Sequence, residues 1–309
     1  MQEEPLYHIP ALLSQALESL NIRPDGVYAD VTFGGGGHSR AIVEKLGPEG
    51  HLYGFDRDEE AVAQAFEDER FTIVHSNFKY IANFLRYHDA GKLDGLLADL
   101  GVSFHHFDSS ERGFSFRMQG PLDMRMNRQG HLTAETVVND YDESRLADIF
   151  YQYGELKTAR RLAAAIVKAR AEKRLTTTDD LLAVVGRMVN PKREKKELAQ
   201  IFQALRIEVN GEMDALKTLL TSSVEVLKPG GRLVIITYHS LEDRLVKNFL
   251  KTGNLNGEEN KDFFGRNLSP FKLITSSPIV PDEEEIERNP RSRSAKMRVA
   301  ELCGAPARN

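Results

Sequence analysis

Apolar and polar positions follow a β/α pattern over roughly the first hundred residues. Short apolar runs at residues 27–31, 51–55, 71–74 and 93–100 are typical of buried strands, and residues 59–67 have the periodicity of a helix. Strands that are separated by helices pair in parallel. This part of the chain therefore predicts an α/β fold with a doubly wound sheet.

The pattern changes after residue 107. The next apolar run of strand character, residues 232–237, begins about 130 residues later and follows Lys228-Pro229-Gly230-Gly231, a turn signal. Most of the sequence in between has helical character, including residues 195–227, which are long enough for one bent helix or two. We expect residues 108–197 to form an inserted all-α domain. Residues 1–107 and 198–309 would form one discontinuous sheet domain, with its last strands at residues 271–275 and 297–302 and the final one antiparallel.

Composition is that of a soluble globular protein, with 41% hydrophobic and 28% charged residues. The first residues, Met1-Gln2-Glu3-Glu4, lack the layout of a signal peptide, and no apolar run is long enough to span a membrane. A single cysteine, Cys303, excludes a disulfide within the chain and suits a reducing compartment. We expect a cytoplasmic protein, and the sequence leaves a homodimer open.

The formal net charge of −5 argues against a nucleic-acid partner, but the distribution of charge argues for one. Residues 155–174 carry seven basic and two acidic side chains, and residues 288–298 carry five basic and no acidic ones. Local basic patches matter more for phosphate binding than the total charge. Both segments are candidates for contact with an RNA backbone, and a solvated helix face is the alternative for the first.

Four consecutive glycines lie in Asp30-Val31-Thr32-Phe33-Gly34-Gly35-Gly36-Gly37-His38-Ser39, between a predicted strand and a predicted helix. Glycines let the backbone approach a ligand, and this layout is typical of a nucleotide-type cofactor site. No lysine follows the glycines, which disfavours a phosphate-binding P-loop, and the register of a dinucleotide fingerprint fails from Gly34 and from Gly35. The adenosyl-methionine loop Asp/Glu-x-Gly-x-Gly-x-Gly fits with one departure, Thr32 in place of the first glycine.

Two carboxylates follow predicted strands. Asp56 ends the second strand, 22 positions after Gly34, which suits hydrogen bonds to ribose hydroxyls. Asp99 ends the fourth strand, at the edge of the sheet where ligands of open α/β folds bind. Phe78, after the third strand, is a candidate to pack on an adenine ring or, alternatively, in the core. The spacing of Gly34 and Asp56 alone does not separate adenosyl-methionine from a dinucleotide.

Six segments together resemble one known family. They cover the glycine loop, the strand that ends at Asp99, two segments that follow it and two near the C-terminus: Thr32-Phe33-Gly34-Gly35-Gly36-Gly37-His38-Ser39, Asp99-Leu100-Gly101-Val102-Ser103, Glu111-Arg112-Gly113-Phe114-Ser115-Phe116, Gly120-Pro121-Leu122-Asp123-Met124-Arg125-Met126, Tyr238-His239-Ser240-Leu241-Glu242-Asp243-Arg244 and Asn289-Pro290-Arg291-Ser292-Arg293-Ser294-Ala295-Lys296. The chain resembles the bacterial ribosomal RNA small-subunit methyltransferase H (MraW) family from about residue 7 to residue 301.

The resemblance implies an enzyme that uses S-adenosyl-L-methionine to methylate the exocyclic N4 of one cytidine in the decoding region of small-subunit (16S) ribosomal RNA. The substrate would be an assembled or nearly assembled small subunit. It also implies a class I methyltransferase (Rossmann-like) sheet domain interrupted by a helical substrate-recognition domain. Carried over residue by residue, the cofactor contacts are Gly36, Gly37, His38, Asp56, Phe78 and Asp99.

One position departs from the family pattern. The family has a glutamine shortly after strand four, in Ser-Ser-Pro-Gln, and His106 takes its place here, in Ser103-Phe104-His105-His106. An imidazole can donate one hydrogen bond, so His106 is a further candidate cofactor contact. The pattern His105-His106-x-Asp108 by itself would suggest a metal site, but adjacent histidines rarely share a metal. We expect no metal.

Methyl transfer from a sulfonium needs mainly proximity and orientation from the protein. Asp99 is the candidate catalytic residue, since a carboxylate could accept the N–H groups of a cytosine amine and help to orient it. Phe114, Phe116 and Tyr238 are candidates to stack on the extracted base, each with core packing as its alternative. Two other functions compete: an NAD-dependent oxidoreductase on a similar sheet, and a non-catalytic RNA-binding factor.

Overall fold

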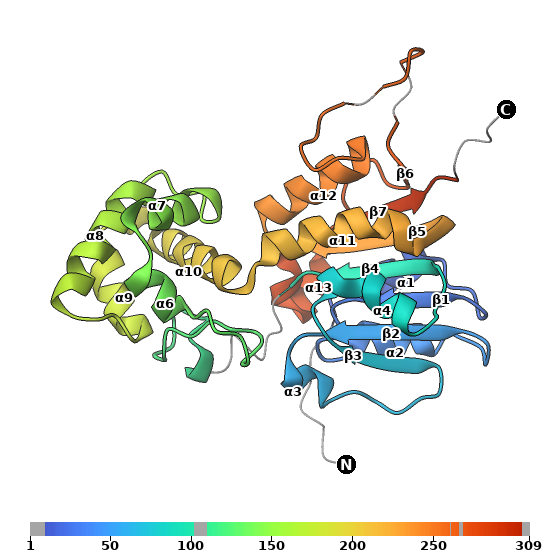
Figure 1. The fold of residues 1–309 in the computed structure, drawn as a ribbon, viewed down its shortest axis with the longest axis horizontal. Helices are drawn as coiled ribbons and strands as arrows, with labels where there is room; N and C mark the ends of the chain where they lie inside the picture. Colours follow the sequence, from blue (N-terminus) through green and yellow to red (C-terminus); the bar gives the residue numbers. More distant parts are fainter. Residues whose placement is uncertain (1–9, 102–109, 260, 266–267, 305–309) are drawn as a thin grey trace. The chain divides into compact units, whose positions relative to one another are not determined.

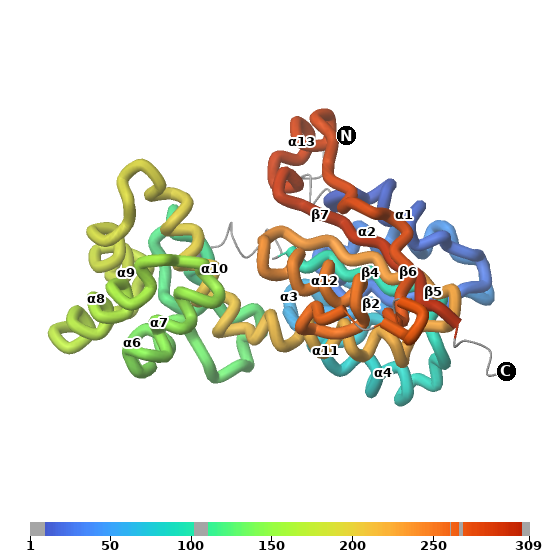
Figure 2. Tube along the Cα trace, turned by 90° about the horizontal axis from the view of Figure 1, so that it is seen from above, coloured from blue at the N-terminus to red at the C-terminus, as the bar shows by residue number. Residues whose placement is uncertain are grey.

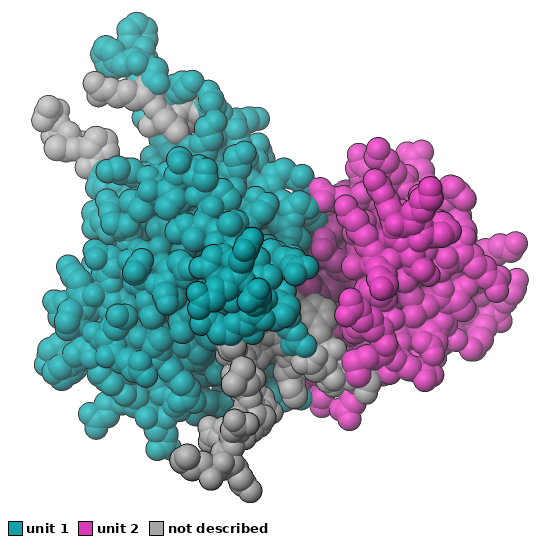
Figure 3. Space-filling model, turned by 180° about the vertical axis from the view of Figure 1, so that it is seen from behind, with its two compact units in different colours: residues 1–101, 214–309 teal, residues 102–213 magenta. Residues whose placement is uncertain are grey.

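The computed structural model describes residues 10–101, 110–259, 261–265 and 268–304 of the 309-residue chain. The chain divides into two compact units: a sheet unit of residues 1–101 and 214–309, and a helical unit of residues 102–213 (Figure 3). Each unit has its own hydrophobic core. Within the described residues, no helix has the length and apolar character needed to cross a membrane.

The sheet unit contains seven strands in the order β3-β2-β1-β4-β5-β7-β6 (Figure 1). All neighbouring pairs from β3 to β5 are parallel, and β7 is antiparallel to both β5 and β6. The strands are β1 (Val27–Asp30), β2 (His51–Asp56), β3 (Phe71–His75), β4 (Leu93–Asp99), β5 (Leu227–Thr237), β6 (Phe271–Leu273) and β7 (Lys296–Leu302). The predicted doubly wound α/β sheet and its antiparallel last strand are confirmed.

Successive strand residues pack on opposite faces of this sheet. Ala29 and Tyr53 belong to one core cluster, whereas the preceding residues, Tyr28 and Leu52, belong to the other. Helices α4 and α12 pack on the first cluster and α1 and α2 on the second, so both faces are covered (Figure 2). The described helices of this unit are α1 (Leu13–Leu20), α2 (Gly37–Val43), α3 (Glu59–Val62), α4 (Ile81–Tyr87), α11 (Glu212–Val226), α12 (Ser240–Thr252) and α13 (Glu283–Arg288). The first two residues of α11 belong to the helical unit.

The helical unit is built around a single cluster of buried residues, to which each α-helix in the described part of the unit contributes. These are α6 (Ala134–Asp140), α7 (Glu143–Gln152), α8 (Ala159–Glu172), α9 (Thr178–Val185) and α10 (Glu194–Asn210). The boundary expected at residue 197 falls inside α10. The buried residues Leu198, Ile201 and Phe202 of α10 belong to the core of the helical unit, which places the whole helix there.

The structure decides two local points that the sequence left open or placed in a turn. Residues 195–227 form two helices, because Gly211 ends α10 with a left-handed backbone at φ 59° before α11 begins. The turn expected at residues 228–231 lies inside β5. There the pairing with β4 passes from Leu93↔Leu227 to Gly95↔Arg232, so these residues bulge out of the ladder.

Candidate active site

Three carboxylates mark the edge of the sheet at which the parallel strands end. Asp30, Asp56 and Asp99 are the last residues of β1, β2 and β4, and β1 pairs directly with both of the other strands. Ligands of open α/β sheets bind outside this edge. The glycine loop connects β1 to α2 at the same edge, so the fold brings the predicted loop and the predicted carboxylates together.

Asp30 holds the glycine loop in place. Its fully buried carboxylate accepts hydrogen bonds from the Ser39 hydroxyl at 2.7 Å and from the Thr32 backbone N–H at 3.1 Å. These bonds tie the start of the loop to the first turn of α2. We interpret Asp30 as the residue that shapes the loop, because its carboxylate oxygens are engaged within the protein.

Thr32, the one departure from the glycine pattern, has a structural role. Its hydroxyl accepts a hydrogen bond from the Asp99 backbone N–H at 2.6 Å and lies 3.3 Å from an Asp30 carboxylate oxygen, to which it can donate. Thr32 is not among the residues with positive φ, so its backbone does not require glycine. A threonine therefore links the ends of β1 and β4 at a position where many cofactor loops have glycine.

The later glycines of the loop are needed for conformation and close packing. Gly34 and Gly36 have φ of 53° and 76°. A Cβ atom on Gly36 would lie 2.8 Å from the Phe33 ring, and one on Gly37 would collide with the ring of Pro10. The loop is thus a tight backbone turn with no side chain on its glycine positions, as the sequence predicted.

Asp56 supports the loop from the neighbouring strand. Its two carboxylate oxygens accept hydrogen bonds from the backbone N–H groups of Gly34 and Asp58, each at 2.8 Å. Burial raises the pKa of Asp56, and these two hydrogen bonds oppose that rise. The side chain is only partly buried, so its remaining lone pairs can accept hydrogen bonds from ligand hydroxyls.

Asp99 carries a polar atom without a partner. Its Oδ1 is buried and accepts no hydrogen bond from the described residues. Burial raises the pKa of Asp99, and the electrostatic influence of His38 and a hydrogen bond from the Tyr238 hydroxyl oppose the rise. A buried acceptor that is left unpaired costs about 1–3 kcal/mol, so it points to a ligand that donates to it.

His38 lies between the loop and Asp99. Its imidazole is buried, with Nε2 3.2 Å from the Ala11 carbonyl oxygen and Nδ1 3.9 Å from Asp99 Oδ2. Since a carbonyl can only accept, Nε2 carries a proton. His38 is therefore a fixed group of the site rather than an exposed loop residue.

The end of β5 completes this edge of the sheet. The ring of Tyr238 packs so closely over Gly101 that a Cβ there would lie 2.8 Å from it. The buried Glu242 accepts a hydrogen bond from the Tyr238 backbone N–H at 3.1 Å, which fixes the start of α12. Burial and the charge of Asp99 raise the pKa of Tyr238 well above its usual value, so the hydroxyl keeps its proton and donates.

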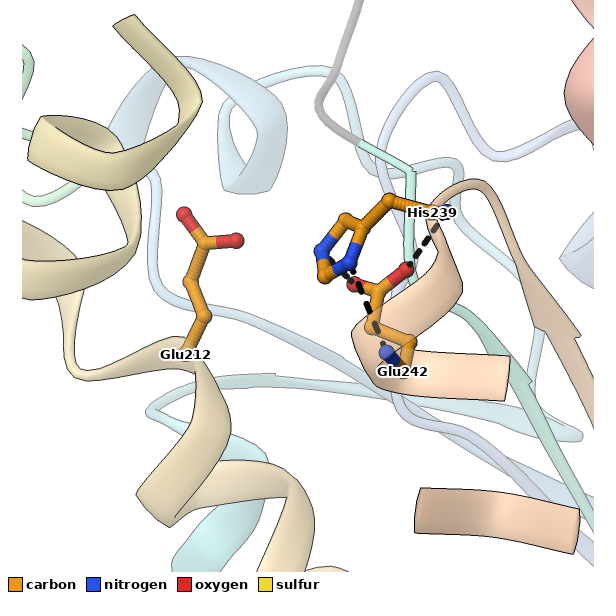
Figure 4. Close-up of side chains that lie close together, drawn as sticks. All are labelled: Glu212, His239 and Glu242. Atoms are coloured by element: carbon orange, nitrogen blue, oxygen red, sulfur yellow. Dashed lines mark hydrogen bonds and ion pairs between the residues drawn. The ribbon is translucent and has the colours of Figure 1, made fainter. Parts of the chain in front are cut away.

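His239 caps the same helix. Its Nδ1 accepts a hydrogen bond from the Glu242 backbone N–H at 3.4 Å, and its Nε2 lies 3.2 Å from Glu242 Oε1 (Figure 4). This reciprocal cap explains the Tyr238–Glu242 part of the sequence motif as local structure. Glu212, also drawn in Figure 4, belongs to the helical unit, where it pairs with Arg206 at 2.9 Å.

The remaining predicted residues divide between the site and the cores. Phe78 begins a short 3-10 helix after β3 and packs, partly buried, against the core of the sheet unit. Phe114 is buried in the core of the helical unit and Phe116 packs against it, which favours core packing over base stacking for both. His106 lies outside the described residues, as do His105 and Asp108.

The sequence did not predict the pairing of Tyr238 with Asp99, although Tyr238 directly follows a predicted strand.

Several basic residues singled out in the sequence are occupied within the protein. Asp243 accepts two hydrogen bonds from Arg298 at 2.7 and 3.2 Å and lies 3.7 Å from Lys296. Lys173 pairs with Asp180, and Arg174 pairs with Glu135 and Asp140. These residues contribute less to an RNA-binding surface than their sequence clusters suggested.

Comparison with known proteins identifies the family. The model of the MraW methylase family matches residues 5–303, nearly the whole chain. The chain belongs to the MraW methylase family. The family resemblance predicted from the sequence is confirmed.

Three relatives illustrate the similarity, each named ribosomal RNA small subunit methyltransferase H. The Bacteroides fragilis protein is 61% identical over 300 residues, which cover 97% of this chain and 99% of the relative. The Porphyromonas gingivalis protein is 55% identical over 97% of this chain and 98% of its own, and the Flavobacterium johnsoniae protein is 54% identical over 96% and 97%. A solved structure, a putative rRNA-methylase from Clostridium thermocellum, aligns over 96% of this chain and 99% of its own with a TM-score of 0.44 and 12% identity.

Proposed function

We propose that this protein is an S-adenosyl-L-methionine-dependent methyltransferase that methylates the exocyclic N4 of one cytidine in the decoding region of small-subunit ribosomal RNA. Membership of a methylase family and the names of the close relatives support the methyl transfer and the RNA class. The structural observation that carries the chemistry is Asp99, whose buried Oδ1, at the edge of the sheet beside the glycine loop, has no hydrogen-bond partner among the described residues. The nicotinamide and the non-catalytic alternatives lose support from the same family match.

The residues at this edge fit the cofactor. Gly36 and Gly37 keep the loop free of side chains, Asp56 has free acceptor capacity for the ribose hydroxyls, and Phe78, which begins the 3-10 helix after β3, is our candidate to pack on the adenine. His38 and Asp99 lie beyond the loop, where we place the methionine end of the cofactor. When bound, the cofactor supplies a methyl group that its sulfonium charge has already activated.

The chain's own contribution is to hold the acceptor amine. The lone pair of cytosine N4 is delocalised into the ring, so the amine must be held and turned before it can react. Asp99 Oδ1 can accept one N–H of the amine, while the Tyr238 hydroxyl donates to the same carboxylate and His38 Nδ1 lies 3.9 Å from Oδ2. Replacement of one N4 hydrogen by a methyl group, with S-adenosyl-homocysteine as the other product, releases one proton, and Asp99 would be the base that accepts it.

The experiment is site mapping of the modified nucleotide. The protein is incubated with labelled S-adenosyl-L-methionine and small subunits from cells that lack the modification, and the RNA is digested and its nucleosides are identified. We expect one methyl group per subunit, on N4 of one cytidine. Label on another atom, on several nucleotides or on none, with the cofactor shown to bind, would overturn the proposal.

The state of the substrate and the assembly of the enzyme are further parts of this proposal. We expect assembled small subunits to be methylated faster than deproteinised RNA, and the reaction to take place in the cytoplasm, where small subunits are found. A parallel reaction with naked RNA tests the first point. Sedimentation of the free protein tests whether it forms a homodimer.

A further inference from the structure

The two units differ in the sign of their charge. Residues 102–213 carry 18 basic and 16 acidic side chains, for a formal charge of +2, while the rest of the chain carries −7. The overall charge of −5 therefore conceals a basic helical unit. For a protein with a polyanionic substrate, this unit is the one to examine for contacts with phosphates.

Within the helical unit, the basic side chains fall into two groups. Some are held by the protein itself: Arg206 pairs with Glu212, Arg145 with Glu208, and Arg125 with Asp123. Others are exposed and have no hydrogen-bond or ion-pair partner for their side chains among the described residues: Lys157, Arg160, Arg161, Lys168, Arg187, Lys192, Arg193, Lys195 and Lys196. Charged side chains kept free at the surface are available to a partner.

The link between α7 and α8 packs against α10. The Gln203 side chain of α10 donates to the Tyr153 carbonyl oxygen at 2.9 Å, and a Cβ on Gly154 would lie 3.2 Å from the Gln200 carbonyl oxygen. The link between α7 and α8 thus lies against the middle of α10. Three residues after Gly154 the link reaches Lys157.

Lys196 of α10 lies on the same side of the helix as this contact. Lys196, Gln200 and Gln203 are spaced three or four residues apart, so they form one stripe along the helix, and Lys196 lies about 6 Å along the axis from Gln200. Arg193 immediately precedes α10. The first turn of α8, which follows Lys157 along the chain, carries Arg160 and Arg161. We name Lys157, Arg160, Arg161, Arg193 and Lys196 the basic corner.

The surroundings of the basic corner favour a phosphate backbone. Residues 155–161 and 187–197 together hold eight basic and three acidic side chains, and one of the acids, Glu197, accepts a hydrogen bond from the Asn190 N–H. Tyr151, in the last turn of α7, exposes 67% of its surface three residues before Gly154. Exposed aromatic rings and free cations are the two features with which proteins bind unpaired nucleotides.

We infer that the basic corner is an RNA-docking surface, which binds the sugar–phosphate backbone of the ribosomal RNA substrate while Tyr151 stacks on a nearby base. This inference rests on the proposed function and adds to it the part of the helical unit that meets the RNA. Its arginines suit phosphate oxygens, because the guanidinium fork donates two parallel hydrogen bonds. The surface is distinct from the sheet-edge residues that we assign to the cofactor and the reacting amine.

The test compares two variants with the same change in net charge. The corner variant is Arg160→Gln, Arg161→Gln, Arg193→Gln and Lys196→Gln. The control variant is Lys45→Gln, Lys92→Gln, Lys247→Gln and Lys272→Gln, four exposed lysines of the sheet unit. Each phosphate contact with single-stranded RNA contributes about 0.7 to the slope of log affinity against log salt. We expect the corner variant to lose roughly 3 from that slope and at least about 10-fold in affinity for deproteinised small-subunit RNA at low salt, and the control to keep both.

The readout is RNA binding, so it separates this inference from the proposed function. Calorimetric titration with S-adenosyl-homocysteine and a thermal unfolding curve check that the corner variant keeps its cofactor site and its fold. An unchanged slope in the corner variant, or an equal loss in the control, would overturn the inference even if the wild-type protein methylates cytidine. A loss seen with assembled subunits but not with RNA would also overturn it, since it would indicate a ribosomal protein as the partner.

Discussion

At the scale of single residues, the unpaired Oδ1 of Asp99 makes the sharpest prediction. In Asp99→Asn the side chain keeps its size but offers the amine a weaker acceptor and no base. We expect the single-turnover rate of methyl transfer to fall by about 10²-fold or more, as for the loss of a general base. Rapid-quench measurement with saturating RNA and cofactor gives the rate. A variant with the wild-type rate would remove Asp99 from the chemistry.

The pKa of Asp99 predicts a pH dependence. Burial raises that pKa, so the carboxylate protonates at a higher pH than an exposed aspartate, and the rate falls as the pH drops through the raised pKa. The Tyr238 hydroxyl lowers the pKa of Asp99. We therefore expect Tyr238→Phe to move the acidic limb of the rate profile to higher pH. Asp99→Asn should lack that limb, and an unmoved limb in Tyr238→Phe would show that the hydroxyl does not act on Asp99.

Thr32 shows what a motif comparison can miss at this scale. From the sequence it is a departure from the glycine pattern, whereas the structure shows its hydroxyl between Asp30 and the Asp99 backbone. Thr32→Val keeps the shape but leaves the Asp99 N–H unpaired, so we expect about 1–3 kcal/mol less unfolding free energy in urea titration. Thr32→Ser keeps the hydroxyl and should lose less than half as much; equal losses would show that the methyl group matters instead.

At the scale of elements, the sequence predicted the sheet well, because strands that are buried on both faces are continuous apolar runs in the sequence. The runs at residues 27–31, 51–55, 71–74 and 93–100 match β1 to β4 within one residue at each end. Features that depend on backbone conformation were harder to predict. The break at Gly211 and the bulge at residues 228–231 have the same glycine signals that mark ordinary turns. The helix expected at residues 59–67 ends at Val62. The prediction was too long because apolar spacing does not show where a helix stops.

The glycine loop makes a prediction as an element. A methyl group on Gly37 would collide with Pro10, so Gly37→Ala must shift the loop or the segment before α1. Overpacking of this kind costs about 1–3 kcal/mol, and we expect S-adenosyl-homocysteine to bind roughly 10-fold or more weakly by calorimetry. Gly91→Ala is the matched control. It has a left-handed backbone, φ 67°, but open space around it, so it should lose stability without losing affinity.

At the scale of the whole molecule, the sequence predicted an insertion but could not give its limits. Helix α10, which belongs to the helical unit, has the same kind of apolar spacing as α11, which returns the chain to the sheet. Only the packing shows that Leu198 and Leu205 belong to one core and Leu216 and Leu219 to the other. The net charge of the whole chain likewise concealed the basic helical unit, because charge can be assigned to a unit only when the limits of that unit are known.

Separate cores predict separate effects on the two ligands. Leu162 is buried in the core of the helical unit, so Leu162→Ala should lower the unfolding free energy of that unit by about 2–5 kcal/mol. Every predicted cofactor contact among the described residues lies in residues 1–101, so the affinity for S-adenosyl-homocysteine should stay unchanged while RNA binding weakens. Leu97→Ala, in the sheet core beside Asp99, is the opposite case and should weaken cofactor binding. Calorimetry with each ligand measures both effects. If Leu162→Ala weakens cofactor binding as much as Leu97→Ala does, the units are coupled in free energy, and the division of labour that we propose between the sheet edge and the basic corner fails.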